Sequence, residues 1–369
     1  MSGRGPFCAL ALAVLALAFT LRLGAALWWD ARLPAGQFAF PDSQSYWELG
    51  HAVADGQPYE FRTPERKVFR APGYPLLLAG LFRAIGEGTS VLAARVLGAA
   101  LGTAAVGVTI WWAARLFDPT TGLTAGLLSA LYPGAIAMST FVLSEALFCP
   151  LMLLHLALWS IALQAVGLRT AIVVGISTGL VAAAASLTRP SCLLFTPLAV
   201  IALAALGQTR RALLVGGVAI AGLIVGMAPW WFRNAQVTGH FVPTTLQVGA
   251  SLYDGLSTTA DGSSNLQPAA DFEARERRRM AHKNLPASEV EYQLDRRLKA
   301  AAYDWARRNP AAALRLAAVK VIRMWNIRPN EPMFRSAALR LAVTTSYVPM
   351  LAEFVDQVHH PDPSAAQKP

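Results

Sequence analysis

The sequence predicts an all-α polytopic membrane protein, and three of its features support this prediction. Of its 369 residues, 54% are hydrophobic and only 15% are charged, whereas soluble domains are usually about 25% charged. Its mean hydropathy is +0.41. Several separate apolar segments also approach the roughly 20 residues that an α-helix needs to cross a bilayer.

About seven or eight spans are predicted, joined by short connections apart from two long intervals. The seven better segments cover about residues 7–29, 90–114, 119–139, 145–166, 170–188, 191–207 and 212–231. An eighth, at about residues 336–356, is weaker, because charged residues and Pro349 interrupt it. Arg4 before the first segment is also a feature of signal peptides, but the length of this segment favours an uncleaved span.

Positive charges in the short loops predict the orientation of these spans. With the N-terminus in the cytoplasm, the alternation of spans places the N-terminal segment and three short basic loops on the cytoplasmic side. The basic residues concerned are Arg4, Arg115, Arg169, Arg210 and Arg211. Long loops are largely exempt from this rule. We therefore expect a multi-pass protein of the plasma (inner) membrane whose long intervals face away from the cytoplasm.

The two long intervals divide the chain into three predicted regions. Residues 1–232 form a transmembrane bundle that includes an outer loop, residues 30–89. Residues 233–335 form an outer-face loop and helical region. Residues 336–369 contain the weak final span and a short tail.

The outer intervals contain predicted helices of their own. The segment "SQSYWELGHAVADG" predicts an amphipathic helix that lies along the membrane plane, and "GYPLLLAGLFRAIG" predicts a second one or a shallow re-entrant helix. Further on, "SEVEYQLDRRLKAAAYDWARRN" predicts a long helix, with Ser288 and Glu291 as a capping box at its start.

Three predicted spans contain glycines four residues apart. The pairs are Gly98/Gly102, Gly175/Gly179 and Gly222/Gly226. Small residues at this spacing let helices approach closely. We expect these pairs to pack helices within one bundle, with a dimer interface as the alternative.

Polar side chains gather at the helix ends that are predicted to lie on the outer face. They are Asp42, Arg70, Tyr74, Arg95, Ser144, Glu145, Arg189, Arg233 and Asn234. An ionisable group costs roughly 2.5–3.5 kcal/mol at the centre of a membrane helix, less near its ends, and usually marks a site. The convergence of so many groups on one side therefore predicts a single site there.

Some of these residues also have structural explanations. Ser144 can cap the N-terminus of the fourth span, with Glu145 favoured at the positive end of that helix. Arg189 can be a snorkelling anchor, with Pro190 starting the next helix. Arg22, inside the first span, is interpreted as a snorkelling or packing residue.

Several classes of protein are disfavoured by what the sequence lacks. The cysteines, Cys8, Cys149 and Cys192, lie far apart in apolar segments and predict neither a disulfide framework nor a zinc site. No phosphate-binding loop, dinucleotide fingerprint or nucleophile elbow is present. The net charge of +10 is scattered, which indicates contact with the lipid bilayer and not with nucleic acid. We expect no cofactor and no metal site.

Four segments occur in an order that is typical of one family. They are "PDSQSYWELGHAVADGQPY", "FRAPGYPLLLAG", "LSEALFCPLMLL" with "SLTRPSCLLF", and "PWWFRNAQVTGHFVPTTLQVGASLYDG". Together they resemble the family 39-type, GT-C membrane glycosyltransferases, which are related to dolichyl-phosphate-mannose protein mannosyltransferases and lipid A aminoarabinose transferases. The resemblance covers about residues 10–330.

The resemblance implies a GT-C-like helix bundle, with residues 1–232 as its catalytic part. It also implies transfer of a sugar from a polyprenyl-phosphate-linked donor to a glycan, lipid or protein acceptor on the outer (periplasmic or lumenal) face. Asp42 matches the acid of the family's first outer loop and is predicted to be the catalytic base. Glu145 is predicted to orient the acceptor or to take part in proton transfer. Direct displacement would invert the anomeric carbon.

A leaving phosphate gains negative charge, and arginine suits it because the guanidinium fork binds two oxygens. We therefore expect three arginines to bind the donor phosphate, in the order Arg189, Arg70 and Arg233. The predicted substrate-binding side chains are Tyr46, Tyr74 and Asn234.

Two other classes of function stay open at this point. One is a multi-pass transporter or flippase of a lipid-linked or small polar substrate, and the other is a catalytically inactive, shortened relative of the family. A transporter needs polar residues along a path through the bilayer, often within inverted repeats. Here the polar residues gather on one face, which favours the enzyme.

Overall fold

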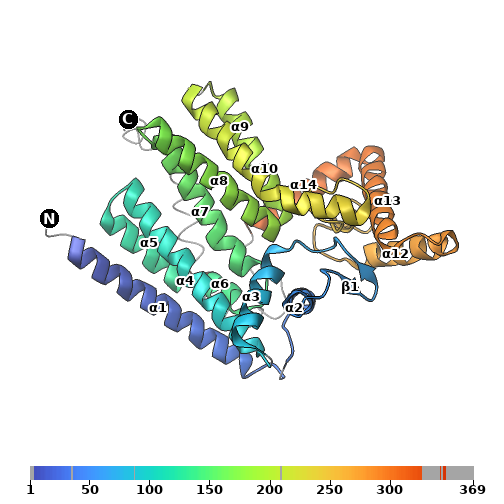
Figure 1. The fold of residues 1–369 in the computed structure, drawn as a ribbon, viewed down its shortest axis with the longest axis horizontal. Helices are drawn as coiled ribbons and strands as arrows, with labels where there is room; N and C mark the ends of the chain where they lie inside the picture. Colours follow the sequence, from blue (N-terminus) through green and yellow to red (C-terminus); the bar gives the residue numbers. More distant parts are fainter. Residues whose placement is uncertain are drawn as a thin grey trace.

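The computed structural model describes residues 4–34, 36–86, 88–207, 210–325, 341 and 344–345. The regular secondary structure of this part of the chain is helical apart from one short antiparallel hairpin, β1 (Phe61–Arg62) with β2 (Glu65–Arg66). The long helices are α1 (Arg4–Asp30), α4 (Val91–Leu116), α7 (Glu145–Gln164), α8 (Leu168–Thr188) and α10 (Arg210–Thr238). They lie side by side, with α2, α3, β1, α12 and α13 gathered at one end (Figure 1).

The shorter helices connect or cover the long ones. They are α2 (Pro41–Ala54), α3 (Gly73–Ile85), α5 (Pro119–Leu131), α6 (Pro133–Thr140), η1 (Pro190–Leu194), α9 (Phe195–Ala205), α11 (Val248–Gly255), α12 (Gln267–Met280), η2 (Ala281–Lys283), α13 (Ala287–Arg308) and α14 (Pro310–Met324). The two predicted outer-loop helices correspond to α2 and α3.

Among the described residues, five helices are long and apolar enough to cross a bilayer, or six if one bent pair counts as a single span. The five are α1, α4, α7, α8 and α10, which match five of the predicted spans. The predicted span 191–207 corresponds to a shorter apolar helix, Pro190–Ala205. The eighth predicted span, at about residues 336–356, lies outside the described residues except for 341 and 344–345.

The predicted span 119–139 is not one straight helix. Helices α5 and α6 meet at an angle of 59°. The break falls at Tyr132, whose backbone is extended (φ −65°, ψ 113°) and which precedes Pro133. Proline lacks an N–H and disfavours helical backbone in the residue before it, so the helix ends there.

Arg22 is a packing residue that stabilises this bend. This residue of α1 is buried, with only 1% of its surface exposed. Its guanidinium donates hydrogen bonds to the carbonyl oxygens of Ser129 (3.2 Å) and Ala130 (3.3 Å) in the last turn of α5. These carbonyls lack helical partners because α5 stops, and a cation is favoured at that helix end.

The long helices alternate in direction, so their ends gather at two opposite ends of the bundle. We call one of them the site end: α1, α6, α8 and α10 finish there, and α4, α7 and η1 begin there. The ion pair between Asp30 and Arg95 joins the end of α1 to the start of α4 at a distance of 2.5 Å. The basic residues predicted to be cytoplasmic, namely Arg4, Arg115, Arg169, Arg210 and Arg211, lie at the other end, as the predicted alternation requires.

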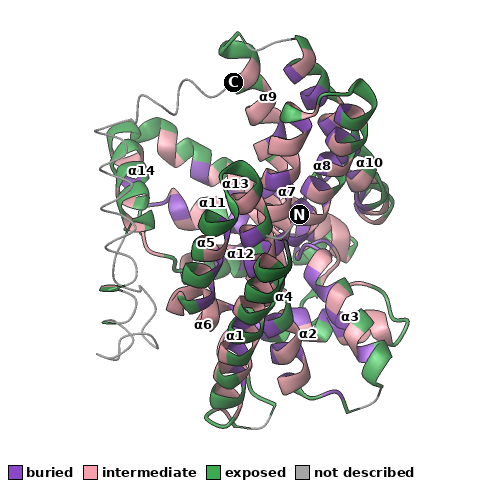
Figure 2. Ribbon diagram, turned by 90° about the vertical axis from the view of Figure 1, so that its left-hand side faces the viewer, coloured by how far each residue is buried: buried purple, intermediate pink, exposed green. Residues whose placement is uncertain are grey.

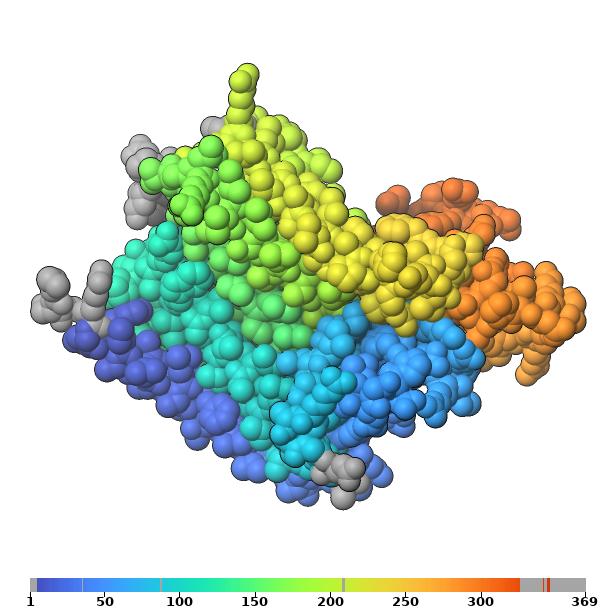
Figure 3. Space-filling model, viewed as in Figure 1, coloured from blue at the N-terminus to red at the C-terminus, as the bar shows by residue number. Residues whose placement is uncertain are grey.

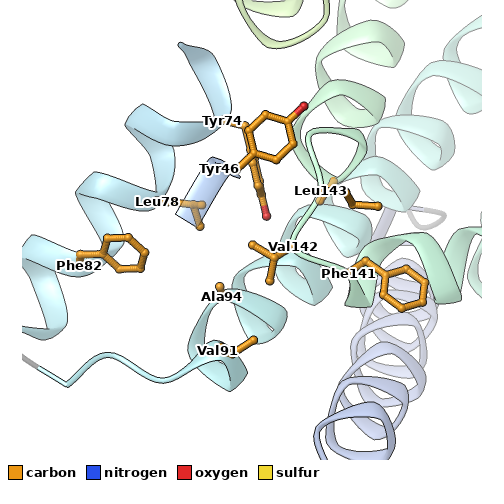
Figure 4. Packing of buried hydrophobic residues seen from close by; sticks show 10 residues of the cluster. Tyr46, Tyr74, Leu78, Phe82, Val91, Ala94, Phe141, Val142 and Leu143 are labelled. Carbon is orange, nitrogen blue, oxygen red and sulfur yellow. The ribbon is translucent and has the colours of Figure 1, made fainter. Parts of the chain in front are cut away.

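Two apolar clusters support the site end. The first packs α2 and α3 against the beginnings of α4 and α7, and includes Tyr46, Tyr74, Leu78, Phe82 and Val142 (Figure 4). The second packs α8 against α10 and the segment after α10. Elsewhere the long helices are buried mainly where they meet, and α1 leaves a large apolar surface exposed (Figure 2). Such a surface suits contact with lipid.

The glycine pairs pack helices within the bundle, as expected. A Cβ atom added at Gly179 of α8 would overlap the carbonyl oxygen of Ala219 in α10. One added at Gly98 of α4 would overlap the carbonyl oxygen of Ser139 in α6. The backbones therefore touch at these positions, and only glycine allows that approach.

We expect Gly179→Ala to lower the free energy of unfolding by about 1–3 kcal/mol, because the added methyl group pushes α8 and α10 apart. The matched control is Gly217→Ala, since Gly217 of α10 has open space where a Cβ would lie. Thermal unfolding of both variants in one detergent measures the difference. Equal unfolding temperatures would contradict the close packing at Gly179.

The predicted capping box at the start of α13 is wrong. The helix begins at Ala287 without a side-chain cap. Glu291 instead is buried and accepts a hydrogen bond of 2.7 Å from the backbone N–H of Lys67, with a longer contact to that of Val68. Burial raises the pKa of the Glu291 carboxyl. This side chain therefore attaches α13 to the segment that precedes α3.

Candidate functional site

A pocket of about 790 Å³ lies at the site end of the bundle, and we call it the polar pocket because four charged side chains line it. Its walls come from α2, the segment before α3, the junction of α6 with α7, the junction of α8 with η1, and the segment that leads into α11. Figure 3 shows that chain segments far apart in sequence meet in this part of the molecule. Five predicted site residues line the pocket: Asp42, Tyr46, Arg70, Glu145 and Arg189.

The first charged pair of the pocket is Asp42 with Arg70. Asp42 lies in the first turn of α2, where the helix dipole favours a carboxylate. Its Oδ1 is 2.5 Å from Nη2 of Arg70. The Arg70 side chain is only 10% exposed and also donates to Oε1 of Gln247 at 3.1 Å, whereas the Asp42 side chain is 53% exposed. The arginine is thus fixed, and the carboxylate faces the open pocket.

The second charged pair is Glu145 with Arg189. Glu145 is the first residue of α7, and Arg189 lies between α8 and η1. Because Pro190 follows, Arg189 has extended backbone (φ −135°, ψ 112°) and α8 ends there. The two side chains form an ion pair and are 39% (Arg189) and 31% (Glu145) exposed. This guanidinium is therefore more open to a ligand than that of Arg70.

Ser144 and Tyr46 lie beside the second pair. The hydroxyl of Tyr46 donates to Oγ of Ser144 at 3.2 Å, and Oγ of Ser144 donates to Oε2 of Glu145 at 3.2 Å. Ser144 makes no side-chain capping hydrogen bond to α7. The capping explanation of Ser144 is therefore wrong.

Tyr74 does not line the pocket. It is 1% exposed and lies behind Tyr46, with the two rings at 86° and their centroids 5.4 Å apart (Figure 4). Edge-to-face contacts of this kind add to the energy of burial. Tyr74 thus supports the ring of Tyr46 from the protein interior.

Arg233 also lies outside the lining of the pocket. Its guanidinium donates to the carbonyl oxygens of Lys67 at 2.7 Å and Tyr59 at 2.8 Å. Both carbonyls belong to the segment between α2 and α3, which also carries Arg70. Arg233 therefore joins the end of α10 to that loop.

Asn234 is fully buried and holds the segment that follows α10. Its Nδ2 lies 3.2 Å from the carbonyl oxygen of Val242. The indole of Trp230 donates to the carbonyl oxygen of Thr244 at 2.7 Å, and that of Trp231 donates to Pro243 at 2.8 Å. The motif "PWWFRN" thus fixes the irregular segment that delivers Gln247 to the pocket.

Sequence reasoning missed Gln247, Thr245 and Ser191, which all line the pocket. Gln247 has the clearest effect on the site because it bonds Arg70. Its only sequence signal is its position within the glycine-rich segment after "PWWFRN". A lone glutamine there gives no indication that it meets an arginine 177 positions away in the chain.

An apolar cavity of about 560 Å³ adjoins the polar pocket. Its walls come mainly from α4, α5, α6 and α7, and it shares Met138 and Glu145 with the polar pocket. Glu145, Cys149 and Leu153 line it at intervals of four residues along α7. With a rise of about 1.5 Å per residue, this side of α7 extends the cavity about 12 Å into the bundle.

Within the described ranges, no three His, Cys, Asp or Glu side chains are grouped so that they could hold a metal ion. Cys8, Cys149 and Cys192 are free thiols.

No protein-family model matches this sequence, and no curated protein sequence matches it significantly. Among solved structures, the chain is similar to the oligosaccharyltransferase of Archaeoglobus fulgidus in its apo form, with a TM-score of 0.52 and 15% sequence identity. The similarity covers 96% of this chain and 38% of the archaeal protein, so this chain spans well under half of that protein's length. At this identity the likeness is one of fold, and it confirms the predicted class: an all-α membrane protein with a GT-C-like helix bundle.

Proposed function

We propose that this protein is a membrane glycosyltransferase of the family 39 type. It transfers a sugar from a polyprenyl-phosphate-linked donor to an acceptor on the outer face of the plasma membrane. One observation carries the proposal: a pocket with two carboxylates and two guanidiniums adjoins an apolar cavity at Glu145. A lipid-linked sugar matches this arrangement, because its apolar chain, anionic phosphate and polar sugar follow one another in the same order. The solved protein of similar fold is named an oligosaccharyltransferase, which supports glycosyl transfer as the class of reaction.

The donor phosphate binds at Arg189. This arginine is the more exposed of the two in the pocket, and its partner Glu145 lines both cavities. The prenyl chain then enters the apolar cavity along α7, and the sugar lies in the polar pocket. Charge-assisted hydrogen bonds from a guanidinium strengthen as the leaving phosphate gains charge. Arg70 adds positive potential but is largely occupied by Asp42 and Gln247.

Asp42 is the catalytic base. An acceptor hydroxyl or amine attacks the anomeric carbon, and its proton passes to the Asp42 carboxylate. The bond between the anomeric carbon and the phosphate oxygen breaks, and its electron pair stays on the polyprenyl phosphate. Attack opposite the leaving group inverts the anomeric carbon. The ion pair with Arg70 holds the carboxylate in place at the edge of the pocket.

The remaining predicted site residues act around this centre. Glu145 aligns Arg189 and meets the acceptor or the donor head group, and Tyr46 borders the sugar. Tyr74 supports Tyr46 from behind. Arg233 and Asn234 hold the two segments that carry Arg70 and Gln247, and neither needs to touch the substrate.

Purified protein in proteoliposomes tests the proposal, with labelled sugars on polyprenyl monophosphate supplied outside and membrane extract as the source of acceptor. We expect loss of the lipid-linked sugar, release of polyprenyl phosphate and label in the acceptor fraction. Movement of intact donor across the bilayer without cleavage would indicate a transporter or flippase instead. If the label stayed on the donor for every lipid-linked sugar tested, the proposal of glycosyl transfer would be overturned.

A further inference from the structure

Ser144 lies at the start of a helix but does not serve that helix. Serine at this position usually accepts a hydrogen bond from the first backbone N–H groups. Here the residue is 2% exposed, its backbone is already helical (φ −59°, ψ −23°), and its hydroxyl makes no such bond. The hydroxyl is instead held between two side chains of the pocket.

Those two contacts give the hydroxyl a defined direction. It accepts from the Tyr46 hydroxyl at 3.2 Å, which leaves its own proton to bond Oε2 of Glu145 at 3.2 Å. Tyr46 is itself 8% exposed and packed against Tyr74. A buried tyrosine therefore holds the serine hydroxyl, and the serine hydroxyl holds one oxygen of the carboxylate.

The other oxygen of the same carboxylate, Oε1, pairs with Nη1 of Arg189. Both oxygens of Glu145 are thus engaged, one by a buried hydroxyl and one by a guanidinium at the pocket surface. Without the serine bond, only the Arg189 contact restricts rotation of the carboxylate about its last side-chain torsion, which is broad. The guanidinium of Arg189, which is held by this carboxylate, would then lose its fixed position.

We propose that Ser144 is a positioning residue, which acts through Glu145 to hold Arg189 in the orientation that receives the donor phosphate. This inference rests on the proposed function of the site. The relay runs from Tyr46 through Ser144 and Glu145 to Arg189, and its first two members are buried.

Binding of farnesyl phosphate to the purified protein in detergent tests the relay without turnover, with farnesol as the uncharged comparison. We expect Ser144→Ala to weaken farnesyl phosphate binding about 3- to 10-fold, consistent with the net loss of one typical hydrogen bond. Farnesol binding should not change. Ser144→Thr keeps the hydroxyl and should restore most of the affinity. Tyr46→Phe removes the other contact of the hydroxyl and should act in the same direction.

A double-mutant cycle separates positioning from general stability. In a Glu145→Ala background, Ser144→Ala should have almost no further effect on farnesyl phosphate binding. An equal loss in both backgrounds would overturn the relay. The matched control is Ser186→Ala, because this buried serine of α8 donates to the Ala182 carbonyl oxygen at 2.8 Å and does not line the pocket. It should leave the affinity unchanged.

The outcomes distinguish this inference from the proposed function. Wild-type protein that binds farnesol and farnesyl phosphate equally would overturn the phosphate site at Arg189, and the relay with it. Preferential binding of the phosphate, with no effect of Ser144→Ala, would overturn the relay alone.

Discussion

Asp42→Asn is expected to lower sugar transfer by about 10²–10⁴-fold, the usual contribution of a positioned base. Asparagine has nearly the same shape, and its side-chain oxygen still accepts a hydrogen bond from Arg70, so the pocket keeps its geometry. What is lost is the group that takes the acceptor proton. Transfer should be measured as the single-turnover rate at saturating donor.

The matched control is Asp55→Asn, because Asp55 is an exposed aspartate just past the end of the same helix, α2. It should leave the rate unchanged. Binding of farnesyl phosphate should also stay within a few-fold in Asp42→Asn. A variant that is folded, binds the phosphate and transfers sugar at the wild-type rate would remove Asp42 from the role of base.

Arg189→Ala should lower kcat/KM for the lipid-linked donor by about 10²–10³-fold, as expected for the loss of one donor group that stabilises transition-state charge. The substitution removes a bond to the leaving phosphate and also leaves the Glu145 carboxylate unpaired in the path of an anion. Arg189→Lys keeps the charge but not the fork, so it should retain part of the activity.

Arg169→Ala is the control for this prediction. Arg169 lies at the start of α8, whereas Arg189 follows the end of the same helix, so the two arginines lie at opposite ends of the bundle. Steady-state kinetics with varied donor should show no change there. If Arg189→Ala altered neither KM for the donor nor kcat, Arg189 would be left with the anchoring role alone.

The sequence was informative about which side chains meet, and the reason is geometric. Hydropathy locates the spans, and alternation of spans then places every second helix end on the same side. Asp42, Arg70, Glu145 and Arg189 follow from this rule alone, and the structure brings all four into one pocket. No knowledge of side-chain packing was needed for them.

The rule does not distinguish a residue that faces the pocket from one that faces a neighbouring loop. Arg233 satisfies it as well as Arg189 does, yet its guanidinium binds two backbone carbonyls. An arginine suits a phosphate and a pair of carbonyls equally, since it offers five donors to either. Only the path of the outer loop decides between them, and that path depends on contacts across the whole chain.

Local rules failed where a side chain had a stronger distant partner. Ser144 and Glu291 both fit helix-capping patterns, but Tyr46 and the backbone of the outer loop bind them instead. Averaged hydropathy also passed over Pro133, although the steric effect of this proline is local and divides the span 119–139 in two.

The two ion pairs have a consequence for charge balance during the reaction. With Asp42 and Glu145 opposite Arg70 and Arg189, the ionisable lining of the pocket sums to zero before a substrate enters. In the proposed reaction a phosphodiester brings one negative charge, and the phosphate monoester that leaves carries one more when fully ionised. Over the same step Asp42 becomes neutral. The total therefore stays constant, and the negative charge only moves across the pocket toward Arg189, so no counterion has to follow it.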